Sequence, residues 1–179
     1  MTWTPRSTAK RSAVTLGLVA TQYREQIEEM ASLLAERNEV EERLARLLGR
    51  PASAGAVGEW IAARVFAIRL EDAGNHRGFD GRFTNGPLAG RSVNIKLYGR
   101  RDVLDVTPEA LPDYYLALTG PKGDGASTRG THVPIRIAGV YLFDAPTLVS
   151  TLRERGVQVG VASSVRATDW GGRPDLPSG

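Results

Sequence analysis

An asparagine and a lysine interrupt the apolar stretch at residues 92–97, where apolar and polar side chains alternate. In a β-strand this alternation places Asn94 and Lys96 on one face and the apolar side chains on the other. Lysine is depleted inside strands, so its presence here calls for an explanation. Asp80 lies upstream, in a second segment of strand character at residues 78–84. A carboxylate, an amide oxygen and an ammonium group on one face could form a divalent-metal site, in which lysine holds a water or a phosphate.

The connection at residues 85–90 decides whether these three side chains meet. Its sequence, Asn-Gly-Pro-Leu-Ala-Gly, is typical of a turn between antiparallel strands. Asp80 shares a face with Asn94 and Lys96 if opposite residues have numbers that sum to 174 or 176, whereas an odd sum separates them. The turn is compatible with either pairing, so the sequence leaves the register open.

The composition indicates a soluble globular chain and excludes several kinds of site. The 179 residues are 41% hydrophobic and 24% charged, which suits one domain with an added arm. The absence of cysteine excludes disulfides, thiolate zinc sites and cysteine nucleophiles, and two histidines are too few for a multi-histidine metal site. Only Lys10, Lys96 and Lys122 among the 23 basic residues are not arginine. The net charge of +3 gives weak support for nucleic-acid binding.

The hydropathy of the chain predicts neither a membrane span nor export. No apolar stretch is long enough to cross a bilayer, so we expect no membrane association. Basic residues ahead of residues 13–20 imitate a secretory signal peptide, but that apolar run is short and contains Thr15 and Gly17. We therefore expect a cytoplasmic protein.

Residues 1–50 are expected to form a helical arm. Residues 1–12 are polar and basic, as in a frayed terminus, whereas residues 19–48 contain neither glycine nor proline. Such an arm could be a dimerisation coil or a lid on the domain, and a packed helical hairpin is an equally good interpretation. The apolar side chains recur at helical spacing, with an interruption at residues 37–39: Tyr23, Ile27, Met30, Leu34, Val40, Leu44 and Leu47.

The pattern from residue 51 to residue 168 predicts an α/β domain with a mixed sheet, followed by a flexible tail at residues 169–179. A Gly- and Ser-rich stretch at residues 120–130 is expected to be a mobile loop. The expected elements are a helix over residues 54–70, strands over residues 78–84, 91–98 and 113–118, one or two strands within residues 133–143, a helix over residues 144–155 and a last strand over residues 157–165.

The order of these residues resembles the PD-(D/E)XK, or restriction-endonuclease-like, nuclease superfamily. The resemblance covers residues 57–165 and rests on Glu59 in a helix, Phe-Asp80-Gly before a turn, and Val-Asn94-Ile-Lys96 in a strand. Within this superfamily, the chain resembles an uncharacterised bacterial branch with an N-terminal helical arm. The resemblance implies a restriction-endonuclease-like mixed β-sheet flanked by helices. It also implies hydrolysis of DNA phosphodiester bonds, with Asp80, Asn94 and Glu59 as Mg²⁺ ligands and Lys96 positioning the attacking water.

Asn94 departs from the family pattern, in which an aspartate or glutamate is usual at this position. An amide oxygen can bind a metal but lacks the negative charge that Mg²⁺ prefers. Either Glu59 compensates, or the domain is a degenerate module that binds nucleic acid or protein without cleaving it. Taken singly, Asp80 could be a turn residue, Lys96 could cover apolar surface with its stem, and Glu59 could be a first-turn helix acid.

Arginines near the strand that carries Lys96 could contact nucleic-acid phosphates. Arg100 and Arg101 follow this strand directly, and Arg82 lies in the preceding segment. Exposed arginine pairs are also common without any ligand, so both interpretations stay open. We expect DNA as a partner and a homodimer formed through the N-terminal helices.

Overall fold

The computed structural model describes residues 9–72, 78–98, 103–120, 135–160 and 163–165. The chain divides into two units between Ala52 and Ser53. We call them the helical unit and the sheet unit.

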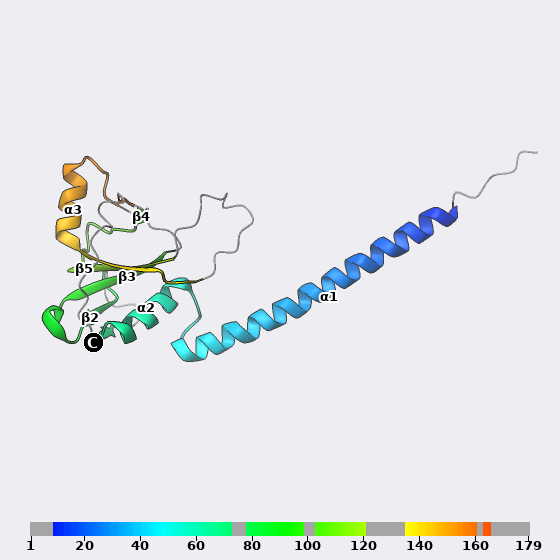
Figure 1. Cartoon of the computed structure of the whole chain (residues 1–179), viewed down its shortest axis with the longest axis horizontal. Coiled ribbons are helices and arrows are strands. Elements are labelled where there is room, and N and C mark those ends of the chain that lie inside the picture. Colours follow the sequence, from blue (N-terminus) through cyan, green and yellow to red (C-terminus); the bar gives the residue numbers. More distant parts are fainter. Residues whose placement is uncertain (1–8, 73–77, 99–102, 121–134, 161–162, 166–179) are drawn as a thin grey trace, which may run out of the picture. The chain divides into compact units, whose positions relative to one another are not determined.

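The helical unit consists of one continuous helix, α1 (Ala9–Leu48), shown in blue to cyan in Figure 1. The helix begins well before residue 19, so residues 9–12 are helical and not frayed. Residues 37–39 interrupt the apolar stripe but not the helix, because none of them is a glycine or a proline. The alternative of a helical hairpin is therefore wrong. The helix ends before Gly49, which adopts a left-handed φ of +72°.

The sheet unit contains a five-stranded mixed sheet with the strand order β1-β2-β3-β5-β6. β3 and β5 are parallel, and the other neighbouring strands are antiparallel. This confirms the predicted α/β class with a mixed sheet. The strands are β1 (Ile68–Leu70), β2 (Gly81–Phe83), β3 (Ser92–Tyr98), β5 (Tyr114–Thr119) and β6 (Gly139–Asp144).

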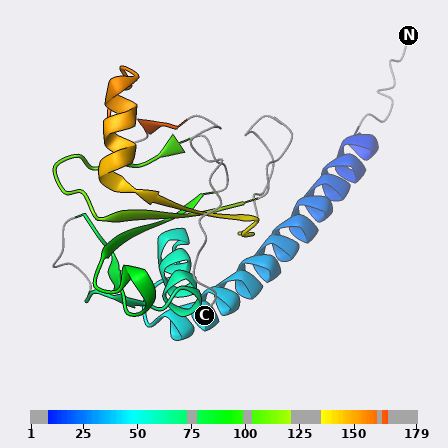
Figure 2. The same ribbon diagram turned by 60° about the vertical axis from the view of Figure 1, so that its left-hand side comes forward.

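Two helices cover opposite faces of this sheet, as both ribbon views show (Figures 1 and 2). On one face, α2 (Ala54–Val65) packs its Ala62 into a core that contains Val93 and Ile95 of β3. On the other face, α3 (Ala145–Glu154) packs into a second core with Tyr115 and Ala117 of β5. The odd-numbered residues of β3 therefore face α2, and the even-numbered ones face α3.

The helix predicted over residues 54–70 is shorter than expected, and a strand replaces its end. α2 stops at Val65, Ala67 adopts a left-handed φ of +48°, and β1 follows at once. The spacing of Val65 and Ile68 suits a helix face. However, Ile68 and Leu70 also alternate as in a strand, and pairing with β2 decides between the two.

The other boundaries differ at the ends of strands. β2 is shorter than residues 78–84, because Gly78 has a φ of +99° and a 3₁₀ helix, η1 (Gly86–Leu88), forms much of the turn. Of the strand expected over residues 157–165, the described residues contain β7 (Ser163–Ser164), which pairs with an unpredicted two-residue strand, β4 (Val103–Leu104). α3 is confirmed, with Asp144 as its N-cap accepting from Thr147 N at 3.0 Å. The loop expected over residues 120–130 lies outside the described residues apart from Gly120.

None of the helices in the described ranges combines the length and the apolar character that a bilayer crossing requires.

Candidate functional site

The register of β2 and β3 brings Asp80 alongside the polar face of β3. Gly81 pairs with Val93 and Arg82 with Ser92, so opposite residues have numbers that sum to 174. This is an even sum, and it places Asp80 next to Asn94 at the end of the β2–β3 ladder. Lys96 follows two residues later on the same face.

Asp80 closes this ladder with both its backbone and its side chain. Its N–H donates to Val93 O at 2.9 Å, and its Oδ2 accepts the N–H of Ile95 at 2.6 Å. β2 therefore accompanies only the first half of β3, and the Asp80 carboxylate stands at the point where the two strands separate. One of its oxygens already has a strong donor, since hydrogen bonds to a carboxylate are charge-assisted.

Asn94 lies beside Asp80 with half of its amide satisfied. Its Nδ2 donates to Gly78 O at 3.3 Å, whereas its Oδ1 is buried without a hydrogen-bond partner among the residues described. A buried acceptor without a donor costs about 1–3 kcal/mol. Such a group in a native fold is expected to serve a ligand, a water or an ion.

Two tyrosine hydroxyls hold a segment of chain over the same face as Asn94 and Lys96. Tyr98 OH accepts the N–H of Asp105 at 2.8 Å, and Tyr115 OH accepts the N–H of Thr107 at 3.3 Å. Burial raises the pKa of both tyrosines, so they stay neutral at physiological pH. The sequence does not indicate these anchors, although both tyrosines lie in predicted strands. They account for the partial enclosure of a face on which Lys96 is half-buried.

Glu59 is not brought onto this face by the sheet. It is half-buried on α2, which packs against the opposite, odd-numbered face of β3. α2 comes close to β3 at Gly58, where an added Cβ would lie 2.9 Å from Cβ of Leu97. The backbone of Glu59, the next residue, therefore lies near the second half of β3, beyond the part of β3 that pairs with β2.

Of the three arginines expected to contact phosphates, the structure describes Arg82. Arg100 and Arg101 lie outside the described residues. Arg82 is engaged within the fold: its Nη1 donates to Gly90 O at 3.0 Å, and its Nε lies 3.5 Å from a carboxylate oxygen of Glu71. Its guanidinium also lies over the ring of Phe79, 4.7 Å from the centroid. Arg82 is therefore a poorer candidate for phosphate contact than its sequence position indicates.

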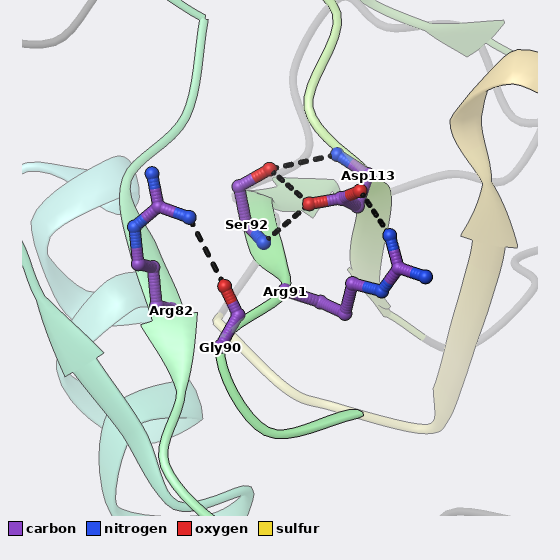
Figure 3. Close-up of polar contacts among 5 residues, drawn as sticks. All are labelled: Arg82, Gly90, Arg91, Ser92 and Asp113. Carbon is purple, nitrogen blue, oxygen red and sulfur yellow. Dashed lines mark hydrogen bonds and ion pairs between the residues drawn. The ribbon is translucent and has the colours of Figure 1, made fainter. Parts of the chain in front are cut away.

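A second polar cluster joins the start of β3 to Asp113, the residue before β5 (Figure 3). Asp113 Oδ2 accepts from both the N–H and the hydroxyl of Ser92, each at 2.7 Å, and Ser92 Oγ accepts the N–H of Asp113 at 2.8 Å. Arg91 Nη1 donates to Asp113 Oδ1 at 3.0 Å. The donors of Ser92 and then Arg91 lower the pKa of Asp113. The sequence gives no sign of this pairing, because its partners meet only through the parallel alignment of the two strands.

The donor set at Asp80 and Asn94 fits Mg²⁺, although it is small. Mg²⁺ commonly binds one or two carboxylates and keeps several waters, with substrate phosphates completing its shell. Asp80 offers carboxylate oxygens, and the buried Oδ1 of Asn94 is an acceptor that a cation would satisfy. Within the described part of the chain, no three His, Cys, Asp or Glu side chains gather in an arrangement that could hold a metal. An ion here would therefore depend on the amide of Asn94.

Comparison with known proteins gives no independent assignment: no family model, no curated protein and no solved structure matches this chain.

Proposed function

We propose that the sheet unit is a restriction-endonuclease-like domain of the PD-(D/E)XK superfamily and hydrolyses DNA phosphodiester bonds with bound Mg²⁺. The observation that carries the proposal is the even register of β2 and β3, which brings Asp80 next to Asn94 with Lys96 on the same face. Asp80 and Asn94 would hold the ion. Glu59 starts from α2 on the opposite face of β3, so it would act as an accessory carboxylate only by reaching past the point where β2 and β3 separate. Mg²⁺ would polarise the phosphate and stabilise the charge that develops on it.

Lys96 is the proposed positioning group for water or phosphate. Its side chain is half-buried, which reduces the competition from bulk water for the ammonium group. A compact ammonium with three donors can hold a water against a phosphate, which the larger, planar guanidinium of arginine does less well. Arg100 and Arg101, which follow β3 in the sequence, are the proposed contacts to flanking DNA phosphates. The proposed compartment is the cytoplasm.

Metal titration and DNA cleavage test this proposal together. Calorimetry with Mg²⁺ and Mn²⁺ is expected to detect one site, and plasmid or branched DNA is expected to be cleaved only with metal. Lys96→Ala should reduce cleavage at least about a hundredfold while metal binding persists, because positioned groups of this kind contribute 10²–10⁴-fold. Lys10→Ala, the same substitution in the helical unit, is the matched control and should leave cleavage unchanged. Cleavage that persists in Lys96→Ala or without metal would refute the proposal.

A non-catalytic module that keeps the fold and binds nucleic acid or protein is the second candidate function. It is favoured by the neutral Asn94 and by the hydrogen bond that already engages one oxygen of Asp80. In this case calorimetry would show no metal site, no DNA would be cleaved, and labelled DNA or a protein partner would still bind. Binding to DNA that weakens steeply with salt would identify phosphates as the ligand.

A further inference from the structure

α1 exposes an apolar stripe along most of its described length. Ile27 and Leu47, near the two ends of this stripe, are 67% and 65% exposed. Contiguous apolar surface on this scale marks an interaction site, because helices in proteins are stabilised mainly by packing an apolar face. The large exposed side chains are Tyr23, Ile27, Met30, Leu33, Leu34, Val40, Leu44 and Leu47.

One ion pair lies within this stripe. Arg37 is seven residues after Met30 and seven before Leu44, so the three side chains follow one line along the helix. Arg37 Nε lies 2.7 Å from Oε1 of Glu41, one turn further on. The arginine precedes the glutamate, which is the less favourable order for an isolated helix. The stripe thus carries one positive and one negative group at its centre, and a partner helix with the opposite charges at those positions would complement both.

We propose that the part of the stripe within residues 30–48 binds the same part of α1 in a second copy of this chain, in antiparallel orientation, with facing residues whose numbers sum to 78. In this register Arg37 faces the partner's Glu41, and Glu41 faces the partner's Arg37. Each charge is then paired once within its own helix and once with the other helix. A parallel in-register pair would instead place each residue opposite itself, with arginine against arginine at the centre. Like charges in such positions oppose association.

The same register aligns apolar residues on both sides of the central ion pairs. Leu34 faces the partner's Leu44, and Met30 faces the partner's Leu48. The apolar contacts therefore supply the affinity, while the charges at the centre select orientation and register. This inference goes beyond the proposed nuclease function and does not depend on it.

Sedimentation equilibrium of the full chain tests the charge pairing. The protein is expected to be a dimer, and Arg37→Glu or Glu41→Arg should raise the dimer dissociation constant about tenfold or more, since two attractions become two repulsions. The double variant R37E/E41R should return it to within about threefold of the original value. Glu42→Arg is the matched control: it disrupts the Glu42–Arg46 pair on the same helix, at 3.7 Å, but lies off the stripe and should leave the constant unchanged.

Disulfide cross-linking tests the orientation, and the absence of native cysteine makes the result specific. Leu34→Cys and Leu44→Cys, oxidised separately, should give no cross-linked dimer, whereas their mixture should give the 34–44 product. Cross-linking of either variant with itself would indicate a parallel pair and overturn the proposal. A monomer at all concentrations would also overturn it and would leave α1 to act as a lid on its own chain.

Discussion

Ser92, the first residue of β3, and Asp113, the residue before β5, are joined by three hydrogen bonds, two into Asp113 Oδ2 and one from the Asp113 N–H to Ser92 Oγ. They are 21 residues apart, and they fix the start of the parallel pair that carries Asn94 and Lys96. A slip of one residue between β3 and β5 would break all three bonds. The cluster therefore stabilises both the fold and the alignment of the candidate site.

This pairing predicts an acid-dependent loss of stability. Because the ionised carboxylate is the form that Ser92 stabilises, the pKa of Asp113 lies below 3.8 in the folded protein. Its contribution to the free energy of unfolding is therefore complete well above the ordinary carboxyl pKa of 3.8, declines as the pH approaches that value, and is lost as the pH falls through the folded pKa. Asp113→Asn should cost about 1–2 kcal/mol near neutral pH, because an amide has a single acceptor oxygen, cannot accept from both Ser92 and Arg91, and carries no charge.

Urea unfolding at a series of pH values measures this effect. The stability difference between the original protein and Asp113→Asn should be constant above about pH 5 and shrink below that. Asp72→Asn, at an exposed position, is the control and should change stability little at neutral pH. A difference for Asp113→Asn that stays constant down to about pH 2.5 would show that ionisation of Asp113 does not stabilise the fold.

Asn94→Asp provides a test of the metal site that does not require catalysis. The buried Oδ1 of Asn94 has no partner in the described residues, and a carboxylate there would add the charge that Mg²⁺ prefers. Without metal, the new charge should lower the melting temperature, because a partly buried carboxylate next to Asp80 is desolvated and repelled. With Mg²⁺ the melting temperature should recover, and the metal affinity should exceed that of the original protein by about tenfold or more.

Asn85→Asp is the matched control for that prediction. Asn85 is exposed at the start of η1 and makes no side-chain cap hydrogen bond there. The same substitution at this position should change neither the melting temperature nor its dependence on Mg²⁺. If the melting temperature of Asn94→Asp were the same in Mg²⁺ as in EDTA, Asn94 would not be a metal ligand.

The sequence predicted the parts of this fold that local patterns determine. Alternation identified β3, a run of apolar and aromatic residues identified β5, and the Asp144-Ala-Pro start identified α3. It failed at β1, because apolar spacing over residues 65–70 fits a helix as well as a strand and only pairing with β2 resolves it. β4 and β7 contain two residues each, too few for any periodicity.

For the candidate site too, the sequence predicted what depends on local pattern but not what depends on strand pairing. Alternation placed Asn94 and Lys96 on one face of a strand, but the sequence left the register open, and only the pairing of β2 with β3 brings Asp80 beside them. The anchors at Tyr98 and Tyr115 were not predictable, because their hydroxyls bind backbone groups of a segment with no pattern of its own.

The close contact between Gly78 and Ala110 yields the last prediction. Gly78 has a φ of +99°, and an added Cβ would overlap with Ala110 O, so an alanine side chain cannot be accommodated without moving the backbone. Gly90 also has a positive φ, +83°, but has open space around its Cβ position. The variant Gly90→Ala therefore measures the cost of backbone strain without the contact. Gly90→Ala should cost about 1–2 kcal/mol, and Gly78→Ala at least about 2 kcal/mol more, in urea unfolding.

Gly78→Ala should also affect the site, because Gly78 O is the acceptor for Asn94 Nδ2 at 3.3 Å. A shift of this carbonyl would release the Asn94 amide and weaken Mg²⁺ binding. Calorimetry at a temperature where the variant is folded measures this effect. Gly90→Ala should leave Mg²⁺ binding unchanged, since Gly90 O contacts Arg82 and not Asn94. Equal losses of stability in the two variants would mean that the chain at Ala110 yields easily and does not fix the position of Gly78.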